Sequence, residues 1–385
     1  MRADLRGPAI IAIPAHNEAA EIERCLAALA MQRDEAGAPV PEGAFEILVF
    51  ANNCSDATAE VARNFAALVP HPVSVIVEQL PPDQRSAGGA RKRAMDLAAG
   101  TLDERGHAGL IFTTDADSCV APTWFAATMR EFGQGVDCVA GYIDANPLEL
   151  VSLGRPFLRR GRLEDTYLRL IAEIDARCDA RPHDPWPNHR VSSGASLAVT
   201  LSAYRAIGGL PPRPVGEDSA LTGALDRAGF RVRHSMEVSV ATSCRLDGRA
   251  QGGAADTMRL RHAEPDAPCD DDLEPALNAT RRAIYRGWLR KLVNGEAQLL
   301  PRGWRVSDAV TKQLLRSDLT FDEAWQQACD HSPILRRGET LRPSDLPRQI
   351  AIANIILQQL RRAVRLAKIV PADRRHHEAT LEPAE

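Results

Sequence analysis

The 385 residues carry 44% hydrophobic and 25% charged side chains, the composition of a globular protein of roughly two or three domain lengths. A net charge of -4 and a pI near 6.2 argue against a nucleic-acid partner. Because the start is polar and no apolar run reaches about 18 residues, we expect neither a signal peptide nor a transmembrane segment, and therefore a cytoplasmic protein.

The eight cysteines form no Cys-x-x-Cys pair. This spacing argues against a zinc ribbon and against a thioredoxin-like redox motif, because both need closely spaced thiols. We therefore expect reduced and mostly buried thiols, the usual state of cysteines in a cytosolic protein.

Strand and helix patterns alternate four times within roughly the first 130 residues. Short apolar runs at 10–13, 46–50, 73–77 and 110–117 predict buried strands, and a helix pattern or helix start follows each. We expect Asn17 to cap the first helix. Because this alternation is typical of a parallel sheet with helices on both faces, we predict an α/β fold whose ligands bind beyond the carboxyl ends of the strands.

A polar cluster follows each of these predicted strands. The clusters are His16-Asn17-Glu18, Asn52-Asn53, Arg91, and Asp115 with Asp117. A dinucleotide fold would place Gly-x-Gly-x-x-Gly after the first strand, where this sequence has Pro-Ala-His-Asn-Glu, and the sequence contains no Walker loop. The motifs therefore argue against hydride transfer and against P-loop chemistry.

Asp115 and Asp117 end the fourth predicted strand and are separated by one residue. Because alternate residues of a strand share a face, we expect both carboxylates to point the same way. Two like charges on one side repel each other unless a cation or a hydrogen-bond donor lies between them. Alone, an Asp-Ala-Asp is more often a solvated turn, so its meaning depends on the motifs around it.

The alternation weakens after a fifth predicted strand at 138–143. A helix pattern at 161–178 precedes the irregular segment 181–189, in which three prolines and two histidines surround Trp186. We interpret that segment as a surface loop over the ligand edge of the sheet. A further strand is predicted at 193–199.

A second acidic pair, Glu217-Asp218, opens a predicted helix, where acids taken alone are usually caps. The strand predicted at 231–240 carries His234, and an isolated strand histidine is usually structural. The basic, glycine-containing loop at 242–253 is of a kind that can close over an anionic ligand.

From about residue 273 the pattern is helical, with helices predicted at 276–298, 307–329 and 344–368. The last of these has one apolar side and a basic end. Such a helix can lie on a membrane surface or form a homodimer contact, although packing on its own domain is the simpler interpretation. The polar residues 373–385 are expected to be disordered.

Five motifs, taken together and in order, resemble those of the family 2 glycosyltransferases and their relatives of the GT-A fold. They are Ile13-Pro-Ala-His-Asn-Glu18, Asn52-Asn-Cys-Ser-Asp56, Gly89-Ala-Arg91, Asp115-Ala-Asp117 and Gly216-Glu-Asp218. The resemblance covers roughly residues 8–250. The chain is also similar to glucosyl- and mannosyl-3-phosphoglycerate synthases in its soluble build and in the histidine that follows the Glu-Asp element.

The resemblance implies a GT-A type fold, with a mostly parallel, Rossmann-like sheet flanked by helices and a helical C-terminal extension. Residues 8–145 would form the nucleotide-binding half of the glycosyltransferase domain, and residues 146–250 its acceptor and catalytic half. A helical region would follow at 251–372. The implied activity is the transfer of a hexose from a nucleotide-diphosphate sugar to a hydroxyl acceptor.

The family's motifs also assign roles to residues of this sequence. The nucleotide sugar would be bound by Pro14, Ala15, Asn17, Glu18, Asn52, Asn53, Arg91, Asp115, Ala116, Arg245 and Arg249. Where many family members have Asp-Asp, this chain has Asn52-Asn53, and because an amide both donates and accepts hydrogen bonds, the preferred base can change. A UDP-sugar is favoured, and a GDP-sugar remains open.

The implied cofactor is Mn²⁺ or Mg²⁺, which neutralises the diphosphate. Asp117 would bind the metal, with Asp115 sharing it or contacting the ribose and His234 as a third contact, and manganese tolerates the nitrogen ligand better. Asp218 would act as general base in an inverting transfer, with Glu217 orienting it or the acceptor. If the phosphoglycerate synthases are the nearer relatives, the transfer is retaining and Asp218 loses that role.

The acceptor, a small molecule or one reached peripherally, is expected to contact the segment 181–196. His183, Trp186 and His189 are the candidate contacts, and Trp186 either stacks on a sugar or packs the loop. Two other function classes remain open, a nucleotidyltransferase that forms a sugar nucleotide and a non-catalytic binder of sugar nucleotides. The first loop lacks a glycine-rich basic signature for a triphosphate, and retention of both acidic sites argues against lost catalysis.

Overall fold

The computed structural model describes residues 8–106, 108–248, 252–296, 302–314 and 319–369. The chain divides into two compact units, which we describe separately. Unit 1 comprises Met1–Arg162, Arg181–Ala267 and Thr320–Glu323, and unit 2 comprises Leu163–Ala180, Pro268–Leu319 and Ala324–Glu385. The division differs from the predicted boundary at residue 250, because residues 163–180 pack with the C-terminal helices rather than with the sheet.

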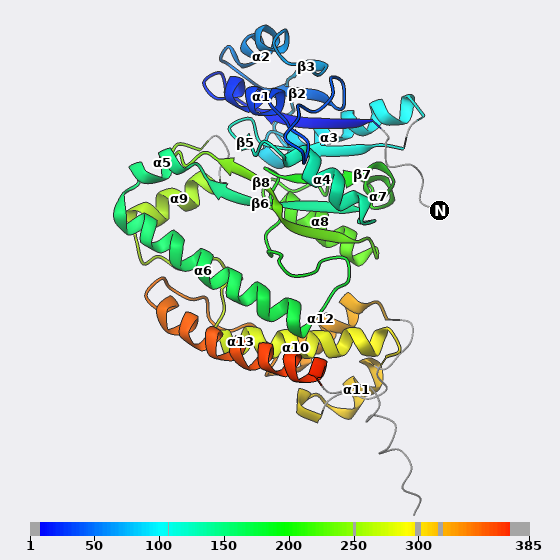
Figure 1. The fold of residues 1–385 in the computed structure, drawn as a ribbon, viewed down its shortest axis with the longest axis vertical. Coiled ribbons are helices and arrows are strands. Elements are labelled where there is room, and N and C mark those ends of the chain that lie inside the picture. The colour runs from blue at the N-terminus through cyan, green and yellow to red at the C-terminus, as the bar shows by residue number, and fades with distance from the viewer. Residues whose placement is uncertain (1–7, 107, 249–251, 297–301, 315–318, 370–385) are drawn as a thin grey trace, which may run out of the picture. The chain divides into compact units, whose positions relative to one another are not determined.

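Unit 1 is built on one mixed sheet, in which the described strands follow the order β3-β2-β1-β4-β7-β6-β8-β5 (Figure 1). Four neighbouring strands run parallel, and β6 and β8 are parallel to each other, whereas β7 and β5 are antiparallel to their neighbours. The strands are β1 Ala9–Ala15, β2 Glu46–Asn52, β3 Val73–Glu78, β4 Leu110–Thr113, β5 Cys119–Val120, β6 Cys138–Ala145, β7 Leu197–Thr200 and β8 Val232–Thr242.

Helices cover both faces of this sheet because its central strands are apolar on both sides. In β1, Ile11 and Ile13 belong to one core, whereas Ile10 and Ala12 belong to the other, as the two-residue period of a strand requires. The first core contains α1 Ile22–Ala30, α2 Thr58–Ala66 and α4 Trp124–Gly133, and the second contains α3 Ala87–Glu104, α7 Leu201–Ala206 and α8 Glu217–Arg227.

Three further helices begin or lie in unit 1. They are α5 Pro147–Ser152, α6 Gly154–Cys178 and α9 Ala254–Ala263. The ring of Phe157 near the start of α6 contacts that of His262 on α9, and the buried Arg160 donates a hydrogen bond to the carbonyl of Pro265. These contacts fix α9 beside the first turns of α6.

Unit 2 is helical. It contains the second part of α6, α10 Ala276–Val293, the 3-10 turn η1 Arg302–Trp304, α11 Asp308–Leu314, most of α12 Phe321–His331, and α13 Leu346–Ile369. Its core gathers Tyr167 and Ile171 of α6 with apolar residues of α10 and α13. The helix predicted at 307–329 is therefore two helices, and the predicted tail at 373–385 lies outside the described residues.

The predicted fold class is confirmed, since a mostly parallel sheet flanked by helices precedes a helical C-terminal region. Two local predictions were wrong. Asn17 does not cap α1, which begins at Ile22; with φ at +56°, Asn17 instead accepts a hydrogen bond from the backbone N–H of Ser55 at 2.7 Å. The fourth strand ends at Thr113, so Asp115 and Asp117 lie in the loop after it.

Two chain-wide expectations can be compared with the structure. None of the eight cysteines, all of which lie in the described residues, forms a disulfide, and four of them, Cys25, Cys138, Cys244 and Cys269, are buried, whereas the prediction was that most would be. Across the described residues, no helix is both long and apolar enough to cross a membrane.

Candidate active site

A cavity of about 600 Å³ lies at the carboxyl-end edge of the sheet in unit 1. Its walls come from the loops after β1, β2, β4 and β8 and from the first residues of α3 and α9. The lining residues are Pro14, Ala15, His16, Glu18, Asn52, Arg85, Ser86, Ala87, Ala90, Arg91, Asp115, Ala116, Asp117, Pro214, Ser243, Arg245, Gly248, Gly253, Ala254, Ala255 and Met258. Its size is that of a typical small-molecule or cofactor site.

Two helices begin at this cavity. Ala87 is the first residue of α3 and Ala254 the first residue of α9, and both line the wall. The hydroxyl of Ser86 caps α3 by accepting the Gly89 N–H at 3.0 Å, whereas Gly253 supplies no side-chain cap to α9. Because helix N-termini carry exposed N–H groups and partial positive charge, this arrangement favours an anionic ligand such as a phosphate.

Gly88 lets the start of α3 pack closely against the segment before α8. A Cβ atom built on Gly88 would lie 1.9 Å from the carbonyl oxygen of Arg213, and the Gly88 N–H bonds to the Pro214 carbonyl at 3.2 Å. A side chain here would push α3 away from Pro214, which lines the cavity. The glycine therefore fixes one wall of the site.

Three carboxylates, those of Glu18, Asp115 and Asp117, line the cavity together with Arg85, Arg91 and Arg245. Arg245 contacts both oxygens of Glu18, at 2.7 and 2.6 Å, and its Nη2 lies 3.0 Å from Asp117 Oδ2. Burial and the neighbouring charge of Asp115 raise the pKa of Asp117 to about 7, although Arg245 acts in the opposite direction. The Asp117 carboxyl in the cavity therefore gives up its proton less readily than an ordinary aspartate does.

Arg91 joins the two acidic motifs in the interior. Its guanidinium donates to Asp115 at 2.6 Å and to Glu217 at 2.9 Å. It also donates to the Thr113 hydroxyl at 3.0 Å and to the Gly194 carbonyl at 2.9 Å. The Arg91 and Glu217 side chains are only 6% and 5% exposed. Arg91 thus holds the loop after β4 against the start of α8.

Asp218 lies beside this ion-pair chain. Its Oδ2 accepts the backbone N–H of Gly194 at 3.0 Å, and its Oδ1 accepts that of Ser219 at 2.7 Å. Neither Glu217 nor Asp218 lines the cavity, so the second acidic motif forms a separate, adjoining position. Gly194 contacts both motifs, because its carbonyl bonds to Arg91 while its N–H bonds to Asp218.

The loop after β2 presents one asparagine to the cavity. Asn52 lines it, and the buried amide oxygen of Asn52 has no hydrogen-bond partner among the described residues. Its carbonyl is 2.9 Å from Nδ1 of His16. Asn53 adopts φ of +51° and exchanges hydrogen bonds with Leu80, so its side chain holds the neighbouring loop instead.

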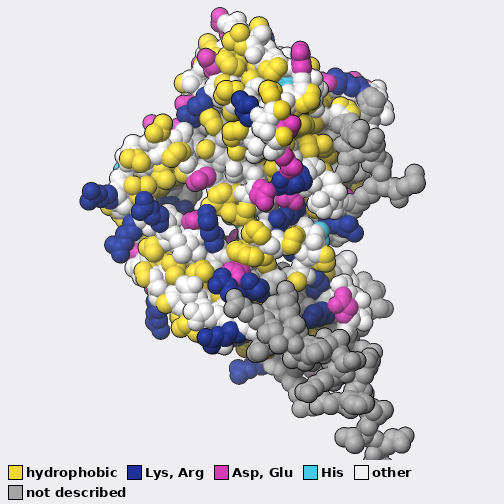
Figure 2. Space-filling model, viewed as in Figure 1, with side chains coloured by type: hydrophobic (Ala, Val, Ile, Leu, Met, Phe, Trp, Pro, Cys, Tyr) yellow, Lys and Arg dark blue, Asp and Glu magenta, His cyan; other side chains and the backbone are white. Residues whose placement is uncertain are grey.

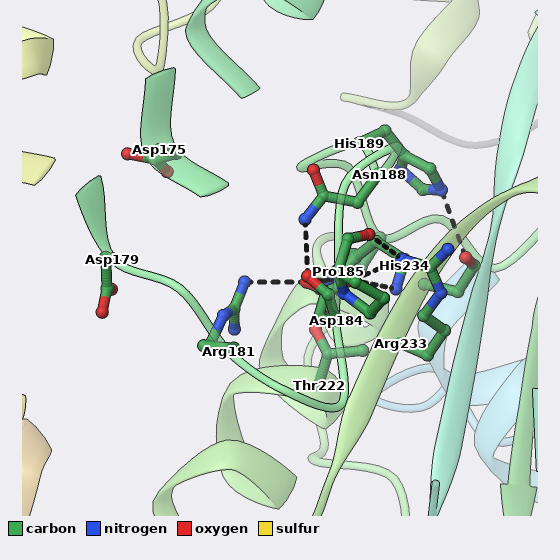
Figure 3. Close-up of polar contacts among 12 residues, drawn as sticks. Asp175, Asp179, Arg181, Asp184, Pro185, Asn188, His189, Thr222, Arg233 and His234 are labelled. Carbon is green, nitrogen blue, oxygen red and sulfur yellow. Dashed lines mark hydrogen bonds and ion pairs between the residues drawn. The ribbon is translucent and has the colours of Figure 1, made fainter. Parts of the chain in front are cut away.

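A second polar cluster lies in unit 1 between the 181–190 loop and β8 (Figure 3). The fully buried carboxylate of Asp184 contacts Arg181 at 2.8 Å, Arg233 at 3.1 Å and His234 Nδ1 at 3.1 Å. Burial alone would raise the pKa of Asp184, but the hydrogen bonds and charge of His234, together with Arg181, outweigh burial and hold this pKa well below its usual value.

His189 and Trp186 occupy opposite environments in this loop. His189 is buried, with Nε2 3.2 Å from the Ala140 carbonyl, and burial together with the charge of His234 lowers the pKa of His189 to about 4. Trp186 is 38% exposed, and His183 is partly buried. None of the three lines the cavity, so a role in acceptor binding stays a prediction.

The structure does not bring His234 to Asp117. His234 lies near the beginning of β8, and its ring contacts Asp184 and, at 3.5 Å, the hydroxyl of Ser192. The cavity is reached only after β8 ends, at Ser243. No group of three or more His, Cys, Asp or Glu side chains within the described ranges is placed to hold a metal ion. The predicted set of Asp115, Asp117 and His234 is therefore not assembled.

The predicted nucleotide-sugar residues divide into two groups. Those that line the cavity are Pro14, Ala15, Glu18, Asn52, Arg91, Asp115, Ala116 and Arg245, and Asp117 joins them. Asn17 and Asn53 do not line it, and Arg249 lies outside the described residues.

Sequence reasoning missed several residues that build the site. Arg85, which precedes the motif Gly89-Ala-Arg91, lines the cavity, and so does His16, which lies within the first motif but was assigned no role. Glu149 accepts hydrogen bonds from Ser243, from the Cys244 N–H and from Arg24, and so fixes the loop that carries Arg245. No sequence signal could have found Glu149, because its partners are far away along the chain.

Comparisons with known proteins find a family match over the part of the chain that carries the first four sequence motifs. The model of the family described as glycosyl transferase family 2 matches residues 10–178. Glycosyltransferase AglE from Haloferax volcanii is 27% identical over 225 residues, which cover 54% of this chain and 68% of AglE.

Two solved structures illustrate the range of similar folds. The mannosyltransferase PcManGT from Pyrobaculum calidifontis, in complex with GDP-Man and Mn²⁺, is 16% identical with a TM-score of 0.44, covering 85% of this chain and 74% of its own. TarS 1-349 from S. aureus, in complex with UDP-GlcNAc, is 14% identical with a TM-score of 0.45, covering 92% of both chains. Both TM-scores are below 0.5, so neither likeness bears on the substrate of this chain.

Proposed function

We propose that this chain is a glycosyltransferase that moves a sugar from a nucleotide-diphosphate sugar to a hydroxyl acceptor, because residues 10–178 match the model of glycosyl transferase family 2. The observation that carries this proposal is the cavity at the carboxyl ends of the strands. There, two helix N-termini line the same cavity as Glu18, Asp115 and Asp117. Anion-binding helix ends beside cation-binding carboxylates suit a diphosphate and its counter-ion.

The nucleotide base would lie against Asn52. The buried amide oxygen of Asn52, which has no partner in the described part of the chain, can accept the imide N–H of uracil or guanine. An asparagine can also donate to the adjacent base carbonyl. UDP remains the favoured nucleotide, with GDP as the alternative.

Asp115 and Asp117 supply oxygen ligands of the kind that a divalent cation accepts, although they are too few to form a complete site. Magnesium and manganese accept oxygen ligands, and such sites commonly use one or two carboxylates together with substrate phosphates. Burial and the charge of Asp115 raise the pKa of Asp117, and a bound cation would favour its ionised form. Asp117, with Asp115, would therefore hold Mn²⁺ or Mg²⁺, whose charge would neutralise the leaving diphosphate. His234 does not fit this site, because it bonds to Asp184.

Asp218 is our candidate for the general base of an inverting transfer. The acceptor hydroxyl would attack the anomeric carbon while its proton passes to Asp218, and the diphosphate would leave with the electrons of the broken C–O bond. The hydrogen bond from Gly194 aims the carboxylate, and the buried Glu217 positions the helix start through Arg91. In a retaining transfer Asp218 would not be the base.

The donor assignment is tested by isothermal titration of the full chain with UDP and GDP, each with and without Mn²⁺. We expect manganese-dependent binding of one nucleotide, weakened by at least about 10-fold in Asp117→Ala because a carboxylate ligand is lost. Asp226→Ala, at an exposed position on α8, is the matched control. Binding of neither nucleotide would contradict the proposed donor class.

Inversion is tested separately by product stereochemistry and by the rate of Asp218→Asn. A loss of about 10²- to 10⁴-fold in rate with an inverted product would support the base role. Retention of configuration would exclude Asp218 as the general base of an inverting transfer. The cytoplasmic location, the contacts of His183, Trp186 and His189 with the acceptor, and a homodimer through the C-terminal helices stay predictions.

A further inference from the structure

Unit 1 carries an exposed apolar and basic surface next to the cavity. We name it the α5 surface and define it by Leu148 and Val151 of α5, Arg155 and Arg159 of α6, and Leu260 of α9. Leu148 is 85%, Val151 66% and Leu260 50% exposed, and both arginines are exposed. Figure 2 shows basic side chains gathered over α5, α9 and the start of α6, beside apolar ones.

The charge of this surface differs from that of the chain. Residues 147–162 contain four arginines and one glutamate, a formal charge of +3, whereas the whole chain carries -4. The single acid, Glu149, is turned inward and bonds to Ser243, Cys244 and Arg24. Arg155 and Arg159 are both exposed to solvent.

Scattered exposed apolar side chains are ordinary, but these are grouped. Leu148 and Val151 are three residues apart and so share one side of α5. The Phe157 and His262 rings bring α9, which carries Leu260, beside the start of α6. Apolar side chains next to arginines are typical of protein surfaces that lie in the interface of an anionic bilayer.

We propose that the α5 surface docks onto an anionic lipid bilayer, with Leu148 and Val151 entering the interface and Arg155 and Arg159 meeting lipid phosphates. Charge complementarity favours this occupant, because the arginines attract anionic headgroups while the apolar side chains gain nothing from a nucleic acid. Docking does not depend on the identity of the donor. A second copy of this chain is an outcome that the test below separates.

Two elements of the α5 surface, α5 and α9, also contact or line the cavity. Glu149 of α5 holds Ser243 and Cys244, which precede the cavity-lining Arg245. On α9, Ala254 and Met258 line the cavity while Leu260 is exposed. Docking would therefore place the cavity beside the lipid surface. If the proposed function holds, the acceptor hydroxyl belongs to a molecule presented at that surface.

The experiment is co-sedimentation of the full chain with vesicles of phosphatidylcholine alone and of phosphatidylcholine containing phosphatidylglycerol, at low and high salt. We expect binding to the anionic vesicles only, weakened by salt. Arg155→Gln with Arg159→Gln should lower the partition coefficient on the order of 25-fold, and Leu148→Ser with Val151→Ser by at least about 10-fold. Leu68→Ser with Arg63→Gln, both exposed on or near α2, should bind like the wild type.

Two further readouts keep the outcomes distinct. Thermal unfolding and nucleotide titration of each variant should match the wild type, which shows that the fold and donor site are intact. Absence of vesicle binding, or equal binding by all variants, would overturn docking while leaving the donor assignment untouched. A wild-type dimer in light scattering that Leu148→Ser with Val151→Ser converts to a monomer would replace the bilayer with a second copy.

Discussion

Unit 1 contains two carboxylate clusters in which one aspartate pKa is shifted in opposite directions. At Asp184, two arginines, a histidine and a backbone N–H surround one carboxylate, and the pKa of Asp184 is held well below its usual value. At Asp117, one arginine is shared with Glu18 while Asp115 adds a second negative charge, and the pKa of Asp117 rises to about 7.

This difference separates a structural cluster from a binding cluster. A buried charge with all its partners present stabilises the conformation around it, and here Asp184 ties the 181–190 loop to β8. A buried charge with too few partners costs stability until a ligand supplies them. At Asp117, burial and the charge of Asp115 disfavour the ionised carboxyl, and a bound cation would favour it.

Among the predicted effects, the loss of stability in Asp184→Asn should be the largest, and it tests whether the Asp184 cluster is structural. This change leaves Arg181 and Arg233 without their buried counter-charge, and we expect the free energy of unfolding to fall by about 3–5 kcal/mol. Urea unfolding measures it. Asp103→Asn, which removes the exposed partner of Arg205, is the control and should cost less than about 1 kcal/mol. Equal losses in the two variants would show that Asp184 is not a structural anchor.

Asp117→Asn should instead raise the free energy of unfolding, by an amount that depends on pH. The folded-state pKa of about 7 lies above the ordinary value, so the folded chain binds more protons and stability falls as pH rises from about 4 to 7. Removing the charge should stabilise the chain by on the order of 2 kcal/mol at pH 8 and by almost nothing at pH 4. Thermal unfolding at both pH values measures this. If Asp117→Asn lost stability at pH 8, the raised pKa of Asp117 would be contradicted.

Arg245→Gln removes the positive charge that contacts Glu18 and Asp117. Because Arg245 is a positive charge beside Glu18 and Asp117, its removal should let Mn²⁺ bind a few-fold more tightly, about 1 kcal/mol. The rise in the unfolding midpoint on adding Mn²⁺ should therefore be larger in the variant than in the wild type. Arg205→Gln is the control. Identical responses to Mn²⁺ would mean that Arg245 does not compete with a cation.

Trp186→Ala should have the smallest effect. Trp186 is 38% exposed, whereas Asp184 two residues earlier is fully buried, so the loop should keep its anchor when the ring is removed. We expect the free energy of unfolding to change by less than about 1 kcal/mol and nucleotide affinity not to change. Urea unfolding measures the first quantity, and isothermal titration with the nucleotide measures the second. A loss as large as that of Asp184→Asn would place the ring among the structural groups of the loop.

The residues that the sequence located best are those at the ends of parallel strands. Pro14 is the next-to-last residue of β1, Asn52 ends β2, and Asp115 and Asp117 follow β4, and all four line one cavity. Apolar runs alternating with helix patterns predict such a sheet, and parallel strands necessarily end at one edge. The helix start at Asn17 was misplaced because a positive φ at that residue depends on the Ser55 loop that it contacts.

The sequence by itself determined the order of strands and helices and the edge at which the polar motifs gather, because both follow from local periodicity. Only the tertiary structure decided which charges meet. Arg245 reaches Glu18 across 227 residues, Arg91 reaches Glu217 across 126, and His234 turns to Asp184 rather than to Asp117. These pairings depend on how far along β8 each residue lies and on the antiparallel β7 placed between β4 and β6, neither of which leaves a local signal.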